Sequence, residues 1–179
     1  MIRKLTYRFL IAIMAMLFFV HDHVKAQRLN YEIVSMYVYN FTKYIEWPDK
    51  SNSDDFVIGV YGQSPVTVML TKYISSKHVG MRPITVKVIN TPEDANTCSI
   101  VFLPMEQSSK IKQLSDQLKG KPVLIISEKY GLSKKGAAIT IFLDEDDDEK
   151  TKFVINKSTV TDCGLIISTN LLRLASQVY

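Results

Sequence analysis

The spacing of hydrophobic residues changes along the chain between the period of a helix and that of a strand. In residues 29–45 apolar side chains recur every three to four positions, which predicts a helix. The predicted core stripe of this helix consists of Leu29, Ile33, Tyr37, Phe41 and Tyr44 or Ile45. Pro48 disfavours helical geometry in the residue before it, so the helix is expected to end there.

Short apolar or alternating runs predict strands at 56–61, 84–89, 98–103, 123–126, 138–143 and 152–155. A second helix is expected after the first of these strands, with Ser64 as N-cap and Pro65 as first helical residue. A third helix is expected to run from Ser108 or Ser109 to Leu118. Strands that alternate with helices favour parallel pairing through right-handed crossovers.

The C-terminal third has a different pattern. The last two predicted strands flank the acidic run 144–149, which predicts an antiparallel hairpin with a solvated tip. The polar segment 156–162 leads to a closing helix over 169–178 that packs through Leu171, Leu174 and Val178. The predicted fold is a single α/β domain with a mixed, mostly parallel sheet of about six strands flanked by helices, a Rossmann-like rhythm and a C-terminal β-hairpin.

Residues 1–26 have the pattern of an export signal. Three basic residues precede the apolar run 9–20, and small or aliphatic residues at 24 and 26 favour cleavage between Ala26 and Gln27. The run would span about 18 Å as a helix, which is short for a hydrocarbon core of about 30 Å. We therefore expect a cleaved signal peptide, an exported domain over 27–179 in the periplasm, and no stable membrane insertion; an uncleaved anchor is the alternative.

Cleavage changes the charge and the available chemistry. The signal carries four basic residues and one acidic residue, so the net charge falls from +4 to +1, and neither nucleic acid nor an anionic bilayer is an expected partner. Only His78 remains of three histidines, which excludes a multi-histidine metal site in the mature chain. His78 lies in a polar stretch that indicates a solvated loop. Enzymatic activity is thus disfavoured, and no catalytic residue, cofactor or metal is expected.

The turn at Gly62, Gln63 and Ser64 is a candidate ligand site. The pair Gly59-x-x-Gly62 that leads into it resembles part of a phosphate-binding turn, but it lacks the third glycine of a dinucleotide fingerprint, and no Gly-Lys-Ser/Thr of a P-loop follows. Free N–H groups at the following helix could hold an anion, or the glycines could serve only a tight turn. The acidic run 144–149 lacks the glycine and glutamate spacing of an EF-hand loop.

Cys98 and Cys163 would both reach an oxidising compartment. They could form a disulfide or remain two separate buried thiols, and their spacing in sequence does not decide between these. The first helix is the most aromatic segment, and Tyr39 is expected to face outward as a candidate protein contact, or simply as a tolerated surface tyrosine. Trp47 is a second candidate for a partner interface.

Four sequence blocks carry a family resemblance. They are the aromatic stretch 34–48 ending in Trp47-Pro48, the strand and turn 58–65, the strand 120–124, and the closing segment with Gly164-Leu165-Ile166-Ile167-Ser168 and Leu171-Leu172-Arg173-Leu174-Ala175. In order and spacing they resemble the YfiR-like family of exported bacterial proteins. This chain departs from that pattern at 135–138, where the family often carries Gly-Gly-Met, and at Cys163, a position usually held by a small residue.

The resemblance implies a non-enzymatic periplasmic protein that forms a homodimer. Its relatives bind the periplasmic sensor domain of a membrane-bound diguanylate cyclase and hold it inactive, thereby limiting cyclic di-GMP signalling and biofilm formation. The alternative hypothesis is a periplasmic small-ligand-binding module that uses the crevice after Gly62 and has no cyclase partner.

Overall fold

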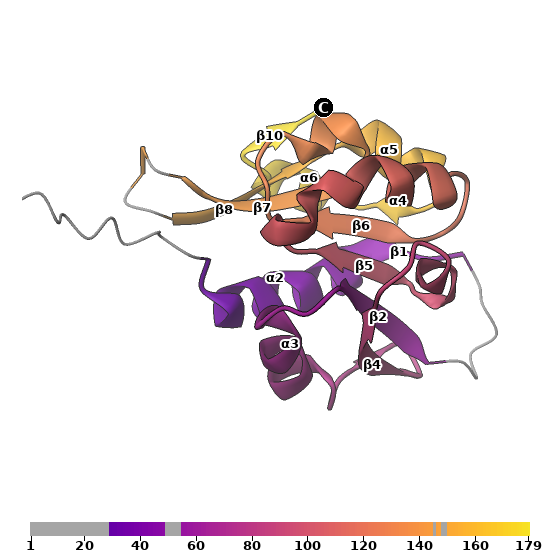
Figure 1. Cartoon of the computed structure of the whole chain (residues 1–179). Coiled ribbons are helices and arrows are strands. Elements are labelled where there is room, and N and C mark those ends of the chain that lie inside the picture. The colour runs from indigo at the N-terminus through magenta and orange to yellow at the C-terminus, as the bar shows by residue number, and fades with distance from the viewer. Residues whose placement is uncertain (1–28, 49–54, 145, 148–149) are drawn as a thin grey trace, which may run out of the picture.

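The computed structural model describes residues 29–48, 55–144, 146–147 and 150–179. Ala26 and Gln27, the predicted cleavage position, lie outside these residues. The described chain forms one α/β domain around a sheet of eight strands in the order β10-β8-β7-β6-β5-β2-β4-β3 (Figure 1). The fold class expected from the sequence is confirmed.

Six of these strands are long enough to correspond to the predicted runs: β2 (Phe56–Tyr61), β4 (Arg82–Ile89), β5 (Ile100–Leu103), β6 (Leu124–Ser127), β7 (Ile139–Asp144) and β8 (Lys150–Ile155). From β4 to β7 all neighbours are parallel, and β7 pairs with β8 in the expected antiparallel hairpin. This hairpin extends away from the rest of the domain (Figure 1). Two short edge strands complete the sheet, β3 (His78–Val79) and β10 (Gln177–Val178).

The helices are α2 (Tyr31–Tyr44), α3 (Val66–Ile74), α4 (Ile111–Gln117), α5 (Lys157–Asp162) and α6 (Thr169–Leu174). Three 3-10 helices join them, η1 (Asp94–Thr97), η2 (Met105–Lys110) and η3 (Leu132–Lys135). β1 (Ile45–Glu46) and β9 (Ile166–Ile167) form a separate two-stranded sheet. The segment after α5 therefore pairs with the residues that directly follow α2 and not with the main sheet.

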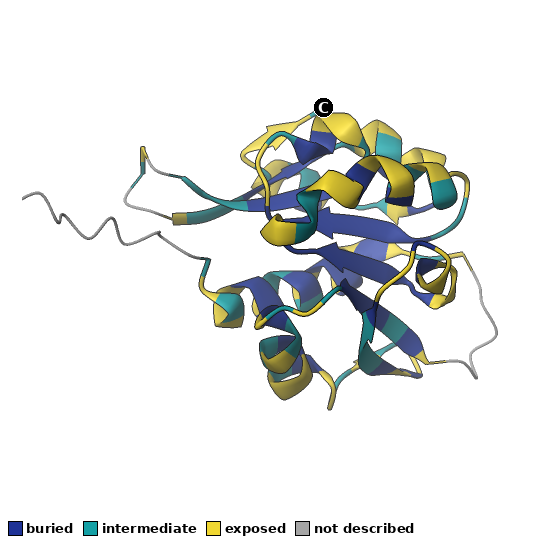
Figure 2. Ribbon diagram, viewed as in Figure 1, coloured by how far each residue is buried: buried dark blue, intermediate teal, exposed yellow. Residues whose placement is uncertain are grey.

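Both faces of the main sheet are buried, because alternate strand residues enter two different hydrophobic clusters. The larger cluster contains Phe56, Ile58 and Val60 of β2 and the inner residues of α2, α3 and α6. The smaller contains Tyr61 and the inner residues of α4, with η1 and η3. Figure 2 shows the central strands as a continuous buried band and the outer helix surfaces as exposed.

The structure corrects the predicted core stripe of the first helix. The buried apolar residues of α2 are Val34, Val38 and Phe41, whereas Ile33 and Tyr44 are exposed. Ile45, the alternative to Tyr44 in the predicted stripe, is buried, and Leu29 and Tyr37 are partly buried against the same cluster. Two stripes with the same spacing run along this helix, and packing against the sheet selects the one that contains both valines. Phe41 belongs to the core, as expected.

The predicted closing helix is also wrong in its second half. α6 ends at Leu174, the chain becomes extended at Ala175, and residues 177–178 pair with β8 as β10. Leu174 and Val178 are consequently exposed, and only Leu171 of the three predicted core residues is buried. The polar segment 156–162 forms helix α5, capped by the Asn156 side chain, which accepts a hydrogen bond from the N–H of Thr159.

Candidate functional site

The strand order identifies one edge of the sheet as the place where a ligand site is expected. From β2 the chain crosses to β4 on one side, and the next strand, β5, lies on the other side of β2. In open parallel sheets, ligands bind at such a switch point, outside the carboxyl ends of the strands. The side chains gathered there are Tyr31, Ser64, Met105, Glu106 and Glu128, and we call this group the carboxyl-edge site.

Each member is placed by the end or start of a regular element. Glu128 directly follows β6, and its N–H donates to the Leu103 carbonyl at the end of β5, 3.3 Å away. Met105 begins η2 and donates its N–H to Oε2 of Glu128 at 2.9 Å. Ser64 follows β2, and Tyr31 is the first residue of α2. The ends of β2 and β6 and the starts of α2 and η2 therefore meet around one carboxyl group.

Glu128 is a buried acid, with 3% of its surface exposed. Burial is the main cause that raises the pKa of Glu128 to about 7, and the charge of Glu106 raises it further. The N–H of Met105 and the hydroxyl of Tyr31 act in the opposite direction and lower the pKa. Within the described part of the chain no hydrogen-bond donor reaches its Oε1 atom. The site therefore holds a carboxyl group that changes charge near neutral pH and has an unused acceptor.

Tyr31 connects the carboxyl group to the turn after β2. The charge and hydroxyl groups of Glu128 and Ser64 act on the Tyr31 phenol, so these three side chains lie near one another. Burial, followed by the charges of Glu128 and Glu106, raises the pKa of Tyr31 to about 12, so the phenol stays protonated. The site thus offers two hydroxyls and two carboxyl groups, a set rich in acceptors.

The predicted ligand turn is only partly included in this site. Gly62 has φ +73°, the left-handed conformation that a tight turn requires, and a Cβ on it would lie 3.0 Å from Nε2 of Gln107. Gln63 is exposed, and Ser64 joins the carboxyl-edge site. The helix begins one residue later than expected, at Val66, whose N–H donates to Oγ of Ser64 at 3.4 Å.

The N–H groups in the first turn of α3 already donate hydrogen bonds within the protein, so they are not free to bind the anion that the sequence suggested. Those of Thr67 and Val68 donate to the carbonyls of Ser64 and Pro65. The chemistry present at this edge is therefore acidic and accepting rather than anion-binding.

The two predicted interface aromatics are less exposed than the sequence suggested. Tyr39, expected to face outward, is half-buried and packs against the larger hydrophobic cluster. Its ring lies 4.5 Å from Nζ of Lys43 and 5.1 Å from Nζ of Lys77. Trp47 is also half-buried.

The indole of Trp47 has clear partners inside the fold. Its Nε1 donates to the Ser99 carbonyl at 3.1 Å, and its ring meets that of Phe56 edge-on with centroids 4.9 Å apart. Trp47 thus anchors the segment after α2 to the sheet. A contact with a partner protein remains a prediction for both Tyr39 and Trp47.

No disulfide joins Cys98 and Cys163 in the structure. Cys98 is buried in the smaller cluster and donates from Sγ to the Asp94 carbonyl at 3.7 Å. Cys163 is half-buried at the end of α5 and lines a cavity of about 390 Å³ between α4 and α5. Burial raises the pKa of the Cys163 thiol. His78 is exposed on the edge strand β3.

Sequence reasoning found only Ser64 of the carboxyl-edge site, and Glu128 is the central residue that it missed. The available signal was an acid directly after an apolar run that reads as a fully buried strand, since such an acid is placed at the carboxyl edge of the sheet. Among the residues that the structure describes, no group of three or more His, Cys, Asp or Glu side chains could hold a metal ion. In the same residues no helix combines the length and the apolar character needed to cross a bilayer.

Comparison with solved structures shows the fold alone. One similar chain is the ABC domain in complex with L-Trp from Streptococcus pneumoniae, with a TM-score of 0.51, 11% identity, and coverage of 70% of this chain and 55% of that one. Another is a conserved domain protein from Vibrio cholerae O1 biovar El Tor strain N16961, with a TM-score of 0.54, 10% identity, and coverage of 83% and 60%. This chain therefore spans little more than half the length of either neighbour.

The sequence comparisons are more specific. No curated protein matches the chain. The sequence profile of the YfiR/HmsC-like family matches residues 31–176, which is nearly the whole α/β domain from the first residue of α2 to the residue before β10. This chain belongs to the YfiR/HmsC-like family.

Proposed function

We propose that this protein is a non-catalytic periplasmic regulator that binds the periplasmic sensor domain of a membrane-bound diguanylate cyclase and represses it. The observation that carries the proposal is the family match over residues 31–176. YfiR-like proteins are periplasmic regulators of diguanylate cyclase systems and form a non-catalytic family. Repression of this kind would limit cyclic di-GMP and biofilm formation.

Binding alone is sufficient for such a function. A regulator needs only a different affinity for the active and inactive states of its partner. Moving a two-state partner from almost fully active to almost fully inactive requires a difference of about 5.5 kcal/mol, which lies within the range of ordinary protein interfaces.

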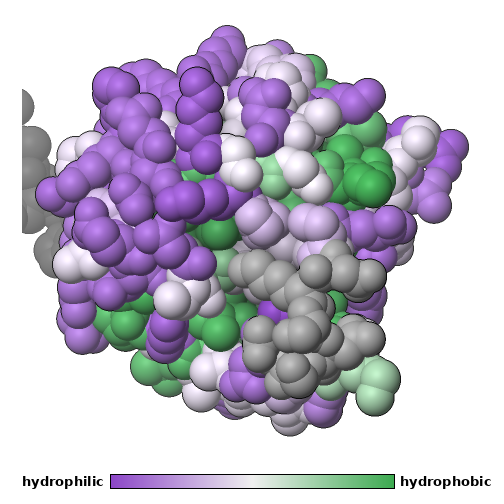
Figure 3. Space-filling model, turned by 90° about the vertical axis from the view of Figure 1, so that its right-hand side faces the viewer, coloured by the Kyte–Doolittle hydropathy of each residue, from purple (hydrophilic) through white to green (hydrophobic). Residues whose placement is uncertain are grey.

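The exposed apolar side of α2 is the surface best suited to this docking. Ile33, Met36 and Tyr44 are 39%, 55% and 36% exposed, although all three are large and hydrophobic. At 100° per residue they fall within about 80° of the helix circumference, and we call them the α2 stripe. Three exposed, large apolar side chains on one side of a helix in a nearly neutral protein favour a protein contact, either with the cyclase or with a second copy in a homodimer. On the face shown in Figure 3, by contrast, hydrophilic residues predominate and the hydrophobic areas are separate.

Tyr39 and Trp47 remain candidates for the margin of this interface. Tyr39 lies on the same helix as the stripe, and its two lysine neighbours would bring positive charge to the contact. Tyr39→Ala is therefore expected to weaken partner or dimer binding. Because the ring packs against the core, a modest loss of thermal stability is expected as well.

The proposal is tested by titrating the purified protein with the periplasmic domain of a diguanylate cyclase encoded beside its gene. Met36→Glu is expected to weaken binding at least tenfold, since it places a charge on the most exposed residue of the α2 stripe. Val68→Glu is the matched control, because Val68 is a 66% exposed apolar residue on a different helix, α3. Absence of binding by the wild-type protein would reject the docking proposal, and equal losses in both variants would reject the α2 stripe.

Export is part of the same proposal. Cleavage between Ala26 and Gln27 would place the domain in the periplasm, and N-terminal sequencing of protein from the periplasmic fraction tests it. A chain retained in the cytosol would remove the basis for contact with a periplasmic sensor.

A small-ligand-binding module is the second candidate function. The observation that favours it is the unused Oε1 acceptor of Glu128 at the switch point of the sheet. A metabolite retained by the purified protein, identified by native mass spectrometry and lost in Glu128→Gln, would support this function.

A further inference from the structure

We propose that the carboxyl-edge site binds a small organic cation through an ammonium or guanidinium group, with Oε1 of Glu128 as its main acceptor. This inference goes beyond the docking proposal and does not depend on it. It concerns a ligand of the isolated protein, whether or not a cyclase is the partner.

The first argument is the unsatisfied atom. Buried side-chain oxygens almost always have a hydrogen-bond partner, and an exception calls for an explanation. Glu128 is almost completely buried, its Oε2 accepts from the Met105 N–H, and its Oε1 has no donor among the described residues. Ammonium and guanidinium groups are donors only, so they supply what this atom lacks.

The second argument is the local charge. The groups that act on Glu128 within the described chain are the N–H of Met105, the carboxylate of Glu106 and the hydroxyl of Tyr31, and none of them is a cation. A buried carboxylate without a counter-charge is costly, and a second carboxylate nearby increases that cost. A bound cation would offset both charges at once.

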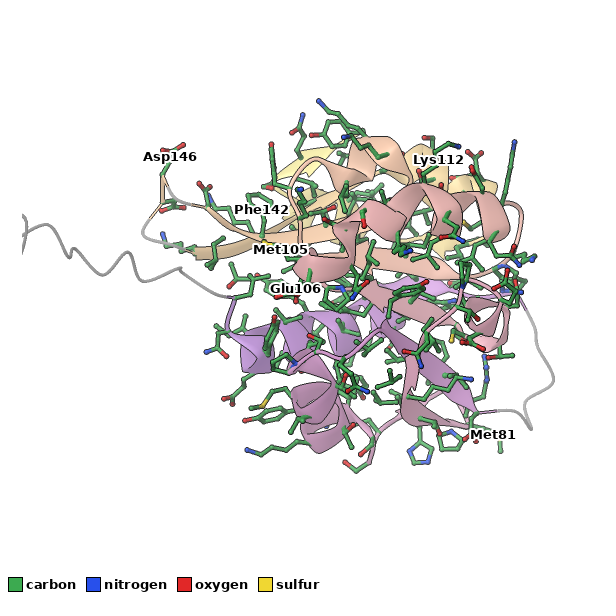
Figure 4. The ribbon with its side chains drawn as sticks, viewed as in Figure 1. Met81, Met105, Glu106, Lys112, Phe142 and Asp146 are labelled. Carbon is green, nitrogen blue, oxygen red and sulfur yellow. The ribbon has the colours of Figure 1, made fainter. Side chains whose placement is uncertain are left out.

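The third argument is the set of polar side chains that surround the Glu128 carboxyl group. Ser64 and Tyr31 add hydroxyl oxygens beside the carboxyl group, which can orient a group with several N–H donors. Met105 and Glu106 are exposed on η2, next to α2 in the view of Figure 4. Met105 could offer apolar contact to the carbon chain of a bound ligand.

The charge state of Glu128 gives the site a characteristic pH dependence. Because a cation binds the ionised carboxylate, binding is expected to release a proton wherever Glu128 is protonated in the empty site. Affinity should therefore fall about tenfold for each pH unit below the pKa of Glu128 and level off above it. A ligand held only by surface charge would lack this profile.

The experiment is an NMR titration of the Glu128 side-chain carboxyl carbon in the purified protein, with and without agmatine or methylguanidinium. We expect saturating probe to lower the pKa of Glu128 by at least one unit. Tetramethylammonium, which carries the same charge but no N–H donor, should have a much smaller effect. An unchanged Glu128 titration with both N–H probes would overturn the proposal.

Variants of single residues show which side chains bind the cation. Glu128→Gln keeps the size and the acceptor for the Met105 N–H, and it should weaken agmatine binding more than tenfold. Tyr31→Phe should weaken binding less. Glu93→Gln, at an exposed acid between β4 and η1, is the matched control and should bind as the wild type does. Equal binding by Glu128→Gln would contradict the assignment, and if that variant failed to fold, the wild-type Glu128 titration would still decide.

Discussion

The Sγ atom of Cys98 fills the space beside the backbone of Gly59, on the smaller-cluster side of the central strand β2. A Cβ atom on Gly59 would lie 2.6 Å from this sulfur and 3.2 Å from two carbons of Ile89. Both neighbours belong to that cluster, so neither can move into solvent. Gly59→Ala is therefore expected to lower the free energy of unfolding by about 1–3 kcal/mol, measured by urea denaturation.

The double variant Gly59→Ala/Cys98→Ala is the control for this contact. Removing the sulfur makes room for the new methyl group, so the loss in the double variant should be smaller than the sum of the two single losses. Additive losses would show that the sulfur is not what opposes a side chain at residue 59.

Phe41 joins α2 to the hairpin strand β8. It is 1% exposed, and its ring meets that of Phe153 edge-on with centroids 5.2 Å apart. Phe41→Ala should cost about 3–5 kcal/mol of stability because it removes a buried ring and leaves a cavity. Ile33→Ala, on the exposed side of the same helix, should change stability by less than about 0.5 kcal/mol. Comparable losses in the two variants would contradict the assignment of the core face.

That core face illustrates how far the sequence could predict the fold. Residues 33, 37 and 41 and residues 34, 38 and 41 both follow helical spacing, so periodicity predicts the helix but not the side that packs on the sheet. The strands were easier to predict, because a sheet covered on both faces needs nearly continuous apolar runs such as 100–103 and 124–126.

The closing segment could not be predicted because long-range pairing overrides local spacing there. Leu171, Leu174 and Val178 have helical spacing, but the N–H of Ser176 donates to the Phe153 carbonyl and that of Tyr179 to the Ile155 carbonyl. These bonds extend the sheet beyond β8, and no local pattern in residues 169–178 encodes them. The carboxyl-edge site was missed for a similar reason, since Tyr31 and Glu128 are brought together only by the tertiary fold.

Trp47 offers a test of the segment between α2 and β2. Its Nε1 donates to the Ser99 carbonyl, which also accepts from the Leu124 N–H at 3.0 Å. Because that carbonyl keeps one partner, Trp47→Phe should cost only about 1–2 kcal/mol in thermal or urea unfolding. A much larger loss would show that the indole packs more tightly than its half-buried position indicates.

The raised pKa of Glu128 predicts that stability depends on pH. The pKa in the native state is about 7, above the ordinary value of 4.5, so the native state holds a proton that the unfolded chain releases between these values. The contribution is therefore fully present below about pH 4.5, and it is lost as the pH rises to about 7, by on the order of 3 kcal/mol.

Glu128→Gln isolates this contribution because the amide keeps the shape of the protonated acid and does not ionise. Its unfolding free energy should change much less between pH 4.5 and 7.5 than that of the wild type, and it should be the more stable protein at pH 7.5. Urea unfolding at five or six pH values measures both curves. If the wild-type and Glu128→Gln curves ran parallel, the pH dependence would arise from other groups. Glu128 would then already be ionised in the folded protein, which is the state expected when a cation is bound beside it.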